Sequence, residues 1–285
     1  MRMRTFIASA LLLLGTAAPA AAASGDPTVA ALQTALAQHG VYTGSVDGLV
    51  GPATQAAVAT LQKEQGLPVD GVVGARTWAA LGPLGRHRLG SRMLRLGQRG
   101  VDVAALQFLL AEHGFPCGIF DGTLGMHTGA ALMRFQRWAG LFPDGIAGAQ
   151  TLTALARPIP AVPLHLAWPA LGLVGSAFGP RGSAFHPGID IVASLGAPVS
   201  AAAAGTVRFA GWNAGGYGNL VVVKHGGGVS TFYAHLSRID VHPGQVIATG
   251  AQIGLIGATG HATGPHLHFE LRLRGAALDP SPALG

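Results

Sequence analysis

The feature that most limits how this chain can fold is an internal duplication in its first half. Ala31-Leu32-Gln33 recurs as Ala105-Leu106-Gln107, and Gly66-Leu67 recurs as Gly140-Leu141, at one constant interval along the chain. About half of the positions between Val29 and Leu81 match their counterparts without a gap. A match of this extent indicates that a whole domain has been duplicated, so the two copies are expected to share one fold.

Each copy contains a shorter signature twice, Asp-Gly-x-x-Gly-x-x-Thr, at residues 47–54, 70–77, 121–128 and 144–151. Asp-Gly favours a turn in which the glycine has a positive φ, and Pro52 after the second glycine is typical of the first position of a helix. Apolar residues at helical spacing, such as Leu32 and Leu36, flank the signatures. We therefore expect two small all-α domains of three helices each. Turn and cap chemistry alone explains the residues of the signature.

Both copies resemble the peptidoglycan-binding domain found beside many wall hydrolases, over residues 27–82 and 96–156. The resemblance implies that bacterial peptidoglycan is a binding partner, with an inert spacer or a folding assistant as the alternative. Five arginines and no acidic residue lie between Gly85 and Val101, namely Arg86, Arg88, Arg92, Arg95 and Arg99. This segment is interpreted as a solvated linker, with contact to a wall polymer as the alternative.

The N-terminus has the pattern of an export signal. Residues 1–4 carry two arginines, residues 6–14 are apolar, and Ala21-Ala22-Ala23 fits the rule for signal peptidase. The apolar run is about half of the roughly 20 residues that a membrane-spanning helix needs. We therefore expect a cleaved signal peptide, no stable membrane insertion, and a secreted or extracytoplasmic location in the periplasm or cell wall.

The overall charge agrees with an exported wall protein. The formal net charge is +6, which favours anionic polymers such as those of the bacterial wall. Basic residues are not interleaved with aromatic ones as in nucleic-acid interfaces, so no nucleic acid is expected as a partner. Cys117 is the only cysteine, which excludes an intramolecular disulfide, and we interpret it as a small packing residue.

The pattern changes after Trp168 to short β-type runs between glycine-rich turns, which predicts an all-β, mainly antiparallel domain. His266, His268 and Glu270 fall on one face of its last strand, so the two imidazoles can converge on one point. Together with His186 and Asp190, such side chains match zinc better than calcium or a thiolate site. Spacing alone leaves open which histidine of the last strand binds the metal.

Three segments in this domain then suggest a family. His186-x-x-x-Asp190, residues 233–236 (Tyr-Ala-His-Leu) and residues 263–270 (Thr-Gly-Pro-His-Leu-His-Phe-Glu) occur in an order and spacing that resemble the lysostaphin and LytM family of zinc endopeptidases. The resemblance implies that one Zn²⁺ is bound by His186, Asp190 and His268. It also implies that His235 and His266 lie beside the metal, contact its water and are catalytic.

Some roles follow from the chemistry and others stay open. A zinc site with three protein ligands keeps a position for water, whose pKa falls towards 7. The chain has no His-Glu-x-x-His motif, so the general base is expected to be His235 or His266. Arg181 and Asn219 are candidate substrate-binding residues, with a surface arginine and a turn-forming asparagine as alternatives. Glu270 is a candidate for contacting a metal-binding side chain on the side away from the metal and so fixing its orientation.

The expected function is a secreted zinc metalloendopeptidase that hydrolyses peptide cross-links of bacterial peptidoglycan and is targeted by tandem wall-binding domains. The alternative is a catalytically inactive wall-bound scaffold or an activator of another wall hydrolase. The expected segments are a signal peptide (1–23), the first binding domain (24–84), a basic linker (85–95), the second binding domain (96–157), a Pro-rich linker (158–169) and the metallopeptidase domain (170–285).

Overall fold

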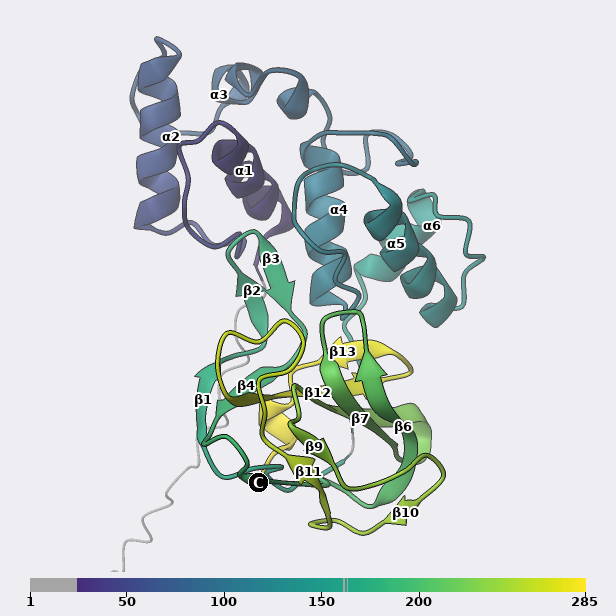
Figure 1. Ribbon diagram of the computed structural model, residues 1–285. Coiled ribbons are helices and arrows are strands. Elements are labelled where there is room, and N and C mark those ends of the chain that lie inside the picture. Colours follow the sequence, from purple (N-terminus) through teal and green to yellow (C-terminus); the bar gives the residue numbers. More distant parts are fainter. Residues whose placement is uncertain (1–24, 161, 163) are drawn as a thin grey trace, which may run out of the picture.

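The computed structural model describes residues 25–160, 162 and 164–285, so the expected signal peptide lies outside the described residues. Figure 1 shows a helical part formed by the N-terminal half of the chain and a sheet part formed by the C-terminal half. The predicted pair of helical domains followed by an antiparallel β domain is confirmed. Within the described ranges, no helix is both long and apolar enough to cross a lipid bilayer.

Three α-helices form each of the two helical copies. The first copy has α1 (Pro27–Gln38), α2 (Pro52–Glu64) and α3 (Ala75–Ala80), and the second has α4 (Val101–Glu112), α5 (Met126–Trp138) and α6 (Ala149–Leu155). The carboxylate of Asp26 begins α1 by accepting hydrogen bonds from the backbone N–H groups of Thr28 and Val29. The first helices of the two copies, α1 and α4, pack against each other.

A buried glutamine holds the turn of each Asp-Gly signature, a role that the sequence analysis missed. The four are Gln33, Gln62, Gln107 and Gln136. Gln62 shows the pattern: its Nε2 donates to Asp70 Oδ1 at 2.8 Å and to the Val72 carbonyl at 3.0 Å, and its Oε1 accepts the Gly71 N–H at 3.0 Å. Gly71 has a φ of 69°, as the Asp-Gly turn predicts. The signature is therefore a structural element of the fold.

We expect Gln62→Ala to lower the free energy of unfolding by about 1–3 kcal/mol, because it removes the buried amide whose hydrogen bonds hold Asp70, Gly71 and Val72 in the turn. Gln55 is exposed on the same helix, so Gln55→Ala is a matched control and should change stability by less than about 0.5 kcal/mol. Chemical denaturation followed by circular dichroism measures both. Equal losses for the two variants would contradict the structural role of Gln62.

The arginine-rich segment between the copies is folded onto the second copy. Leu94 is buried and exchanges two backbone hydrogen bonds with Ala147, at 3.1 and 2.9 Å. Arg92 Nε donates to the buried carboxylate of Asp102 at 2.7 Å, near the start of α4. The segment is therefore ordered structure rather than a solvated chain, at least around Arg92 and Leu94.

The sheet part is built on one antiparallel sheet of eight strands, in the order β1-β4-β12-β8-β7-β6-β10, with β13 pairing to β12. In that order the strands are Leu173–Ser176, Ile189–Val192, His266–Leu273, Val229–Ala234, Gly218–Lys224, Gly205–Asn213 and Val246–Ile247, and β13 is Ala276–Leu278. A smaller sheet contains β5 (Pro198–Ser200), β11 (Gln252–Leu255) and β9 (Arg238–Ile239). The core lies between them, where Ile191, Leu267 and Phe269 are fully buried.

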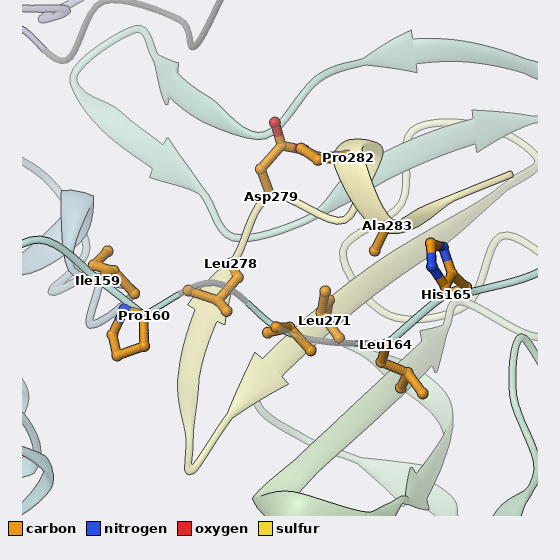
Figure 2. Close-up of a pocket in the computed structure, with 10 residues that line it drawn as sticks. Ile159, Pro160, Leu164, His165, Leu271, Leu278, Asp279, Pro282 and Ala283 are labelled. Atoms are coloured by element: carbon orange, nitrogen blue, oxygen red, sulfur yellow. The ribbon is translucent and has the colours of Figure 1, made fainter. Parts of the chain in front are cut away.

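The segment after α6 packs against the core of the β domain. Leu166 is buried in the core of the β domain, and Leu164 packs against the same core. Figure 2 shows Leu164 near Leu271 of β12 and Pro160 near Leu278 of β13, around a pocket that this segment closes on one side. The Pro-rich segment is therefore held against the β domain.

The hairpin formed by β2 (Gly179–Arg181) and β3 (Ala184–His186) reaches from the sheet part into the helical part (Figure 1). At its tip, the Val46 N–H of the first copy donates to the Gly182 carbonyl at 2.8 Å. The Phe120 N–H of the second copy donates to the Ser183 carbonyl at 2.6 Å. Phe185 is buried in the core of the second copy, close to Cys117. The three domains are thus packed together.

Candidate metal centre

Three elements bring His186, Asp190 and His268 to one point. His268 of β12 lies directly opposite Asp190 of β4 in the antiparallel ladder. His186 ends β3 and is returned towards Asp190 by Pro187-Gly188. Gly188 is required here, because a Cβ at this position would lie 2.3 Å from the Phe269 carbonyl oxygen. The His-Pro-Gly-Ile-Asp sequence is therefore a close turn against β12.

The polar atoms of these side chains are close enough to share one ion. Asp190 Oδ1 is 3.0 Å from His186 Nε2 and 2.8 Å from His268 Nδ1, and the two imidazole nitrogens are 3.0 Å apart. Ligand atoms on a tetrahedral zinc ion are about 3.3 Å apart, given bond lengths near 2.0 Å. The donor set of two imidazoles and one carboxylate therefore fits zinc in type and in spacing.

Each imidazole is held by its other nitrogen. His186 Nδ1 is 2.8 Å from the Ala177 carbonyl oxygen, and His268 Nε2 is 2.9 Å from Glu270 Oε1. With these nitrogens donating, His186 Nε2 and His268 Nδ1 are the atoms directed at the shared point. Such outer contacts set the tautomer and the ring orientation of a metal-binding histidine.

The charges of the three residues depend on one another. Burial disfavours the Asp190 carboxylate, but hydrogen bonds from His186 and His268 outweigh this and lower its pKa. Burial also disfavours a charged His268, but its hydrogen bonds to Asp190 and Glu270 raise its pKa to about 9. A metal ion would therefore displace a proton from His268, so that metal binding is coupled to proton release.

Glu270 lies behind His268 and is completely buried. Its carboxylate accepts hydrogen bonds from the Tyr217 hydroxyl at 2.7 Å and from Arg272 Nε at 2.6 Å, in addition to His268. Burial alone would raise the pKa of Glu270, but the Arg272 guanidinium and the His268 contact hold it at about 2. Glu270 is therefore an ionised group that faces the back of His268 and not the open side of the cluster.

His235 and His266 lie beside the three clustered residues. Their ring centroids are 4.8 Å apart, and His266 Nε2 is 3.7 Å from Asp190 Oδ1. Carbonyl groups hold both Nδ1 atoms, that of Thr259 for His235 at 2.7 Å and that of Gly264 for His266 at 2.9 Å. This leaves Nε2 of each ring to exchange a proton with a substrate or water.

The position of His235 has two further features. It has a φ of 63°, in the left-handed region that residues other than glycine seldom adopt. Strain of this kind is concentrated at functional sites, where the surrounding structure enforces it. Burial, and after it the charge of His266, lowers the pKa of His235, although the Thr259 contact opposes this. The imidazole is therefore neutral at pH 7.

The clustered residues line one cleft of the β domain, together with further side chains at its rim. Its lining includes Arg181, His186, Asp190, Tyr217, His235, His261, Thr263, His266 and His268. Arg181 lies at the edge, where its Nη1 contacts Asp190 Oδ2 at 3.1 Å. His261 and Tyr217 also line the cleft, and neither was among the candidate site residues of the sequence analysis. The folding of their loops brings both side chains to the cleft.

Asn219 does not line this cleft. Its Nδ2 donates to the Leu236 carbonyl at 3.0 Å, and its N–H donates to Thr259 Oγ1 at 3.0 Å. These contacts join β7 to the loop that follows His235. The side chain is thus placed to position the His235 loop rather than to face a substrate.

Comparison with known proteins agrees with the geometry. The sequence pattern of peptidase family M23 matches residues 184–280, which contain the three clustered residues and the two histidines beside them. The pattern of a peptidoglycan binding domain matches residues 25–81 and 99–155, one match for each helical copy.

Individual relatives match part of the chain. DD-carboxypeptidase/endopeptidase Mpg of Neisseria meningitidis is 48% identical over 95 residues, which are 33% of this chain and 22% of that protein. A lipoprotein NlpD/LppB homolog of Pseudomonas aeruginosa is 43% identical over 114 residues, which are 40% of this chain and 38% of that protein. The chain therefore spans less than half the length of either relative. The solved catalytic domain of lysostaphin from Staphylococcus simulans is 33% identical, with a TM-score of 0.37, over 39% of this chain and 90% of that one.

Proposed function

Because its C-terminal domain belongs to peptidase family M23 and follows two peptidoglycan binding domains, we propose that this protein is a zinc metalloendopeptidase that hydrolyses peptide cross-links of bacterial peptidoglycan. The observation that carries the proposal is the convergence of His186, Asp190 and His268 beside two further histidines in one cleft. A scaffold without catalytic chemistry has no need of this arrangement.

In this proposal His186 Nε2, Asp190 Oδ1 and His268 Nδ1 hold one Zn²⁺. When bound, zinc acts as a Lewis acid that lowers the pKa of water and polarises a peptide carbonyl. The side chains of His186 and His268 are buried, whereas that of Asp190 is partly exposed towards the cleft. A peptide lying in the cleft would therefore approach from the side of Asp190.

Proton transfer falls to His235 and His266. Glu270 is unsuited to act as the base, because it is fully buried and its contacts are taken by His268, Tyr217 and Arg272. His235 is neutral at pH 7 and has a free Nε2, so it is able to accept a proton from the attacking water. His266 has its Nε2 3.7 Å from Asp190 Oδ1 and is able to stabilise the developing oxyanion or protonate the leaving amine. The two roles are not assigned separately.

The proposed substrate and location of this protein rest on the relatives and on the two helical copies. One relative is named a DD-carboxypeptidase/endopeptidase, so cross-links between D-amino acids are the first bonds to test. Another is named a lipoprotein homolog, which together with the N-terminal export pattern supports an extracytoplasmic location. Arg181 is proposed to contact a carbonyl or carboxylate of the peptide, because it lies at the edge of the cleft and is mostly exposed.

The proposal is tested by incubating the purified protein with isolated peptidoglycan and measuring the soluble fragments. Release should stop when a chelator removes the metal and return when Zn²⁺ is added back. A catalytically inactive scaffold would release nothing under any of these conditions, although it would still sediment with the peptidoglycan. Release that persists in chelator would contradict the zinc assignment.

Glu270 offers a separate prediction. Glu270→Gln keeps the size of the side chain but removes the charge that holds His268 by its Nε2. We expect zinc affinity to fall by about 10- to 100-fold, since partners of this kind orient metal-binding histidines. Titration against a competing chelator measures the affinity. Asp240 is ionised and contacts only exposed partners of the same domain, so Asp240→Asn is the control and should leave zinc affinity unchanged.

A further inference from the structure

The second helical copy is held in a fixed position against the β domain. The Trp138 indole donates to the Leu273 carbonyl at 3.2 Å, and the Ala277 N–H donates to the Gly114 carbonyl at 3.0 Å. Gly114 has no room for a side chain, because a Cβ there would lie 2.2 Å from the Ala277 carbonyl oxygen. The turn between β12 and β13 therefore sits against α5, as Figure 1 shows. A ligand bound across this junction would lie at a set distance from the metal centre.

A pocket at this junction contains three arginines. Arg134 and Arg137 come from α5, Arg274 comes from the turn after β12, and the aromatic rings of Phe115 and Trp138 complete the lining. All three arginines are exposed, so a ligand in solution can reach them. Arg274 lies over the Trp138 ring, with its guanidinium carbon 5.6 Å from the centroid. The pocket thus combines cationic groups with an apolar surface, contributed by two domains.

Among the described residues, none of the three arginines forms a salt bridge, and no acidic residue lines the pocket. Arg134 donates one hydrogen bond, from Nη2 to the Pro116 carbonyl at 3.3 Å, and this neutral partner supplies no counter-charge. Burial and the nearby charge of Arg272 lower the pKa of Arg134. The dipole of α5 accounts for Arg137 in its last turn, but not for Arg134 or Arg274. An anion bound among the three arginines would offset the repulsion between their like charges.

The backbone conformation of Arg274 is a second unusual feature of this pocket. Arg274 and Gly275 form the two-residue turn between β12 and β13, with φ values of 51° and 93°. Turns with positive φ at both positions strongly favour Asn-Gly or Asp-Gly, because other side chains are strained at the first position. An arginine in this place is disfavoured by the local fold, and the contact that its side chain makes outside the turn is with the Trp138 ring of the same pocket.

The cluster lies along the strand that carries the candidate metal ligand. Arg274 follows the end of β12, six positions after His268, which at about 3.3 Å per residue is about 20 Å along the strand. About six extended residues of a peptide cover the same distance. Between the two points lie Tyr217, which lines the metal cleft, and Arg272, both near enough to influence Arg134.

We propose that Arg134, Arg137 and Arg274 form an anion-binding subsite that holds a carboxylate of a peptidoglycan stem peptide while the bond to be cut lies at the metal centre. Guanidinium groups bind carboxylates through two parallel hydrogen bonds, and the Trp138 ring offers a surface for the rest of the peptide. The inference rests on the proposed function, because peptidoglycan is taken to be the substrate. It makes the second binding domain part of the substrate site rather than a separate tether.

The test measures sedimentation of the full chain with peptidoglycan that has been freed of phosphate polymers. The variant Arg134→Gln/Arg137→Gln/Arg274→Gln is compared with Arg157→Gln/Arg208→Gln/Lys224→Gln, which removes the same charge from exposed residues outside the two peptidoglycan-binding copies. We expect the first variant to bind about tenfold more weakly than the second. Peptidoglycan whose carboxylates have been chemically amidated should bind the two variants equally. Circular dichroism checks that both are folded.

Three results would overturn the inference. The two variants could bind untreated peptidoglycan equally, or the difference could persist after amidation. The difference could also be confined to walls that retain their phosphate polymers, which would identify phosphate as the ligand. Cleavage of a short soluble cross-linked peptide, measured in parallel, separates this question from the proposed function. If no form of the protein cleaves that peptide, the peptidase proposal fails, and the binding comparison still decides the subsite.

Discussion

The variant His268→Ala should lose both its bound zinc and its cleavage of peptidoglycan. His268 is the residue of the cluster that contacts Asp190, His186 and Glu270 at once, so its removal opens one metal position and takes a hydrogen-bond partner from two carboxylates. We expect cleavage to fall by at least about a thousandfold, since metal catalysis contributes several kcal/mol of transition-state stabilisation. Elemental analysis of the purified protein and fragment release from isolated peptidoglycan measure the two effects.

A matched control is His242→Ala. His242 is an exposed histidine of the same domain, and its ring contacts only the Pro243 carbonyl. This variant should keep one zinc per chain and normal cleavage. If the His268→Ala variant also keeps its zinc, the metal is bound by other residues and the assignment of the centre is wrong.

The variants His235→Ala and His266→Ala should keep zinc and lose activity. Neither side chain belongs to the three-residue cluster, and both present a free Nε2 to the same cleft. Removal of a general acid or base lowers the rate by about 10²- to 10⁴-fold, and we expect a loss in this range for each variant. The rate constant at saturating substrate, measured on a soluble cross-linked peptide, is the readout. Elemental analysis verifies that zinc is retained.

His261 provides the comparison for these two variants. It lies at the rim of the same cleft, so it reports on changes in shape without a role in proton transfer. His261→Ala should therefore lower the rate only a few-fold. Cleavage by His235→Ala and His266→Ala at the rate of the unaltered protein would show that another group moves the proton.

The fold of the helical part was predictable from the sequence, because it depends on patterns formed by residues close together in the chain. Duplication, Asp-Gly turns and helical spacing predict three helices per copy, and the structure has them. The role of the buried glutamines in holding the Asp-Gly turns was not predicted, because a glutamine within a helix has no distinctive sequence pattern. Gln62 is tied to its turn by residues that follow it by eight to fifteen positions, and this link exists only once the chain has folded.

The candidate site was predictable in composition but not in arrangement. Alternation along β12 places His266, His268 and Glu270 on one face, yet it cannot say that Asp190 lies opposite His268 in the ladder. That register depends on pairing between strands far apart in the chain. The contacts of Glu270 with Tyr217 and Arg272 depend on the same pairing.

The packing of the domains had no signal in the sequence. At the tip of the β2–β3 hairpin the contacts are mainly backbone hydrogen bonds, such as that from the Val46 N–H to the Gly182 carbonyl, which any residue type can form. Charge patterns were also ambiguous. Arg92 forms a salt bridge with buried Asp102, whereas Arg134 and Arg274 form none with any residue that the structure describes, and the sequence does not distinguish the two cases.

The most direct test of the proposed activity is to identify the new chain ends in fragments released from isolated peptidoglycan. Mass spectrometry should find peptides with a new amino group and a new carboxyl group, formed only when zinc is present, while the glycan strands stay intact. Fragments with cut glycan strands and intact peptides, or no new peptide ends from peptidoglycan of several compositions, would contradict a zinc endopeptidase.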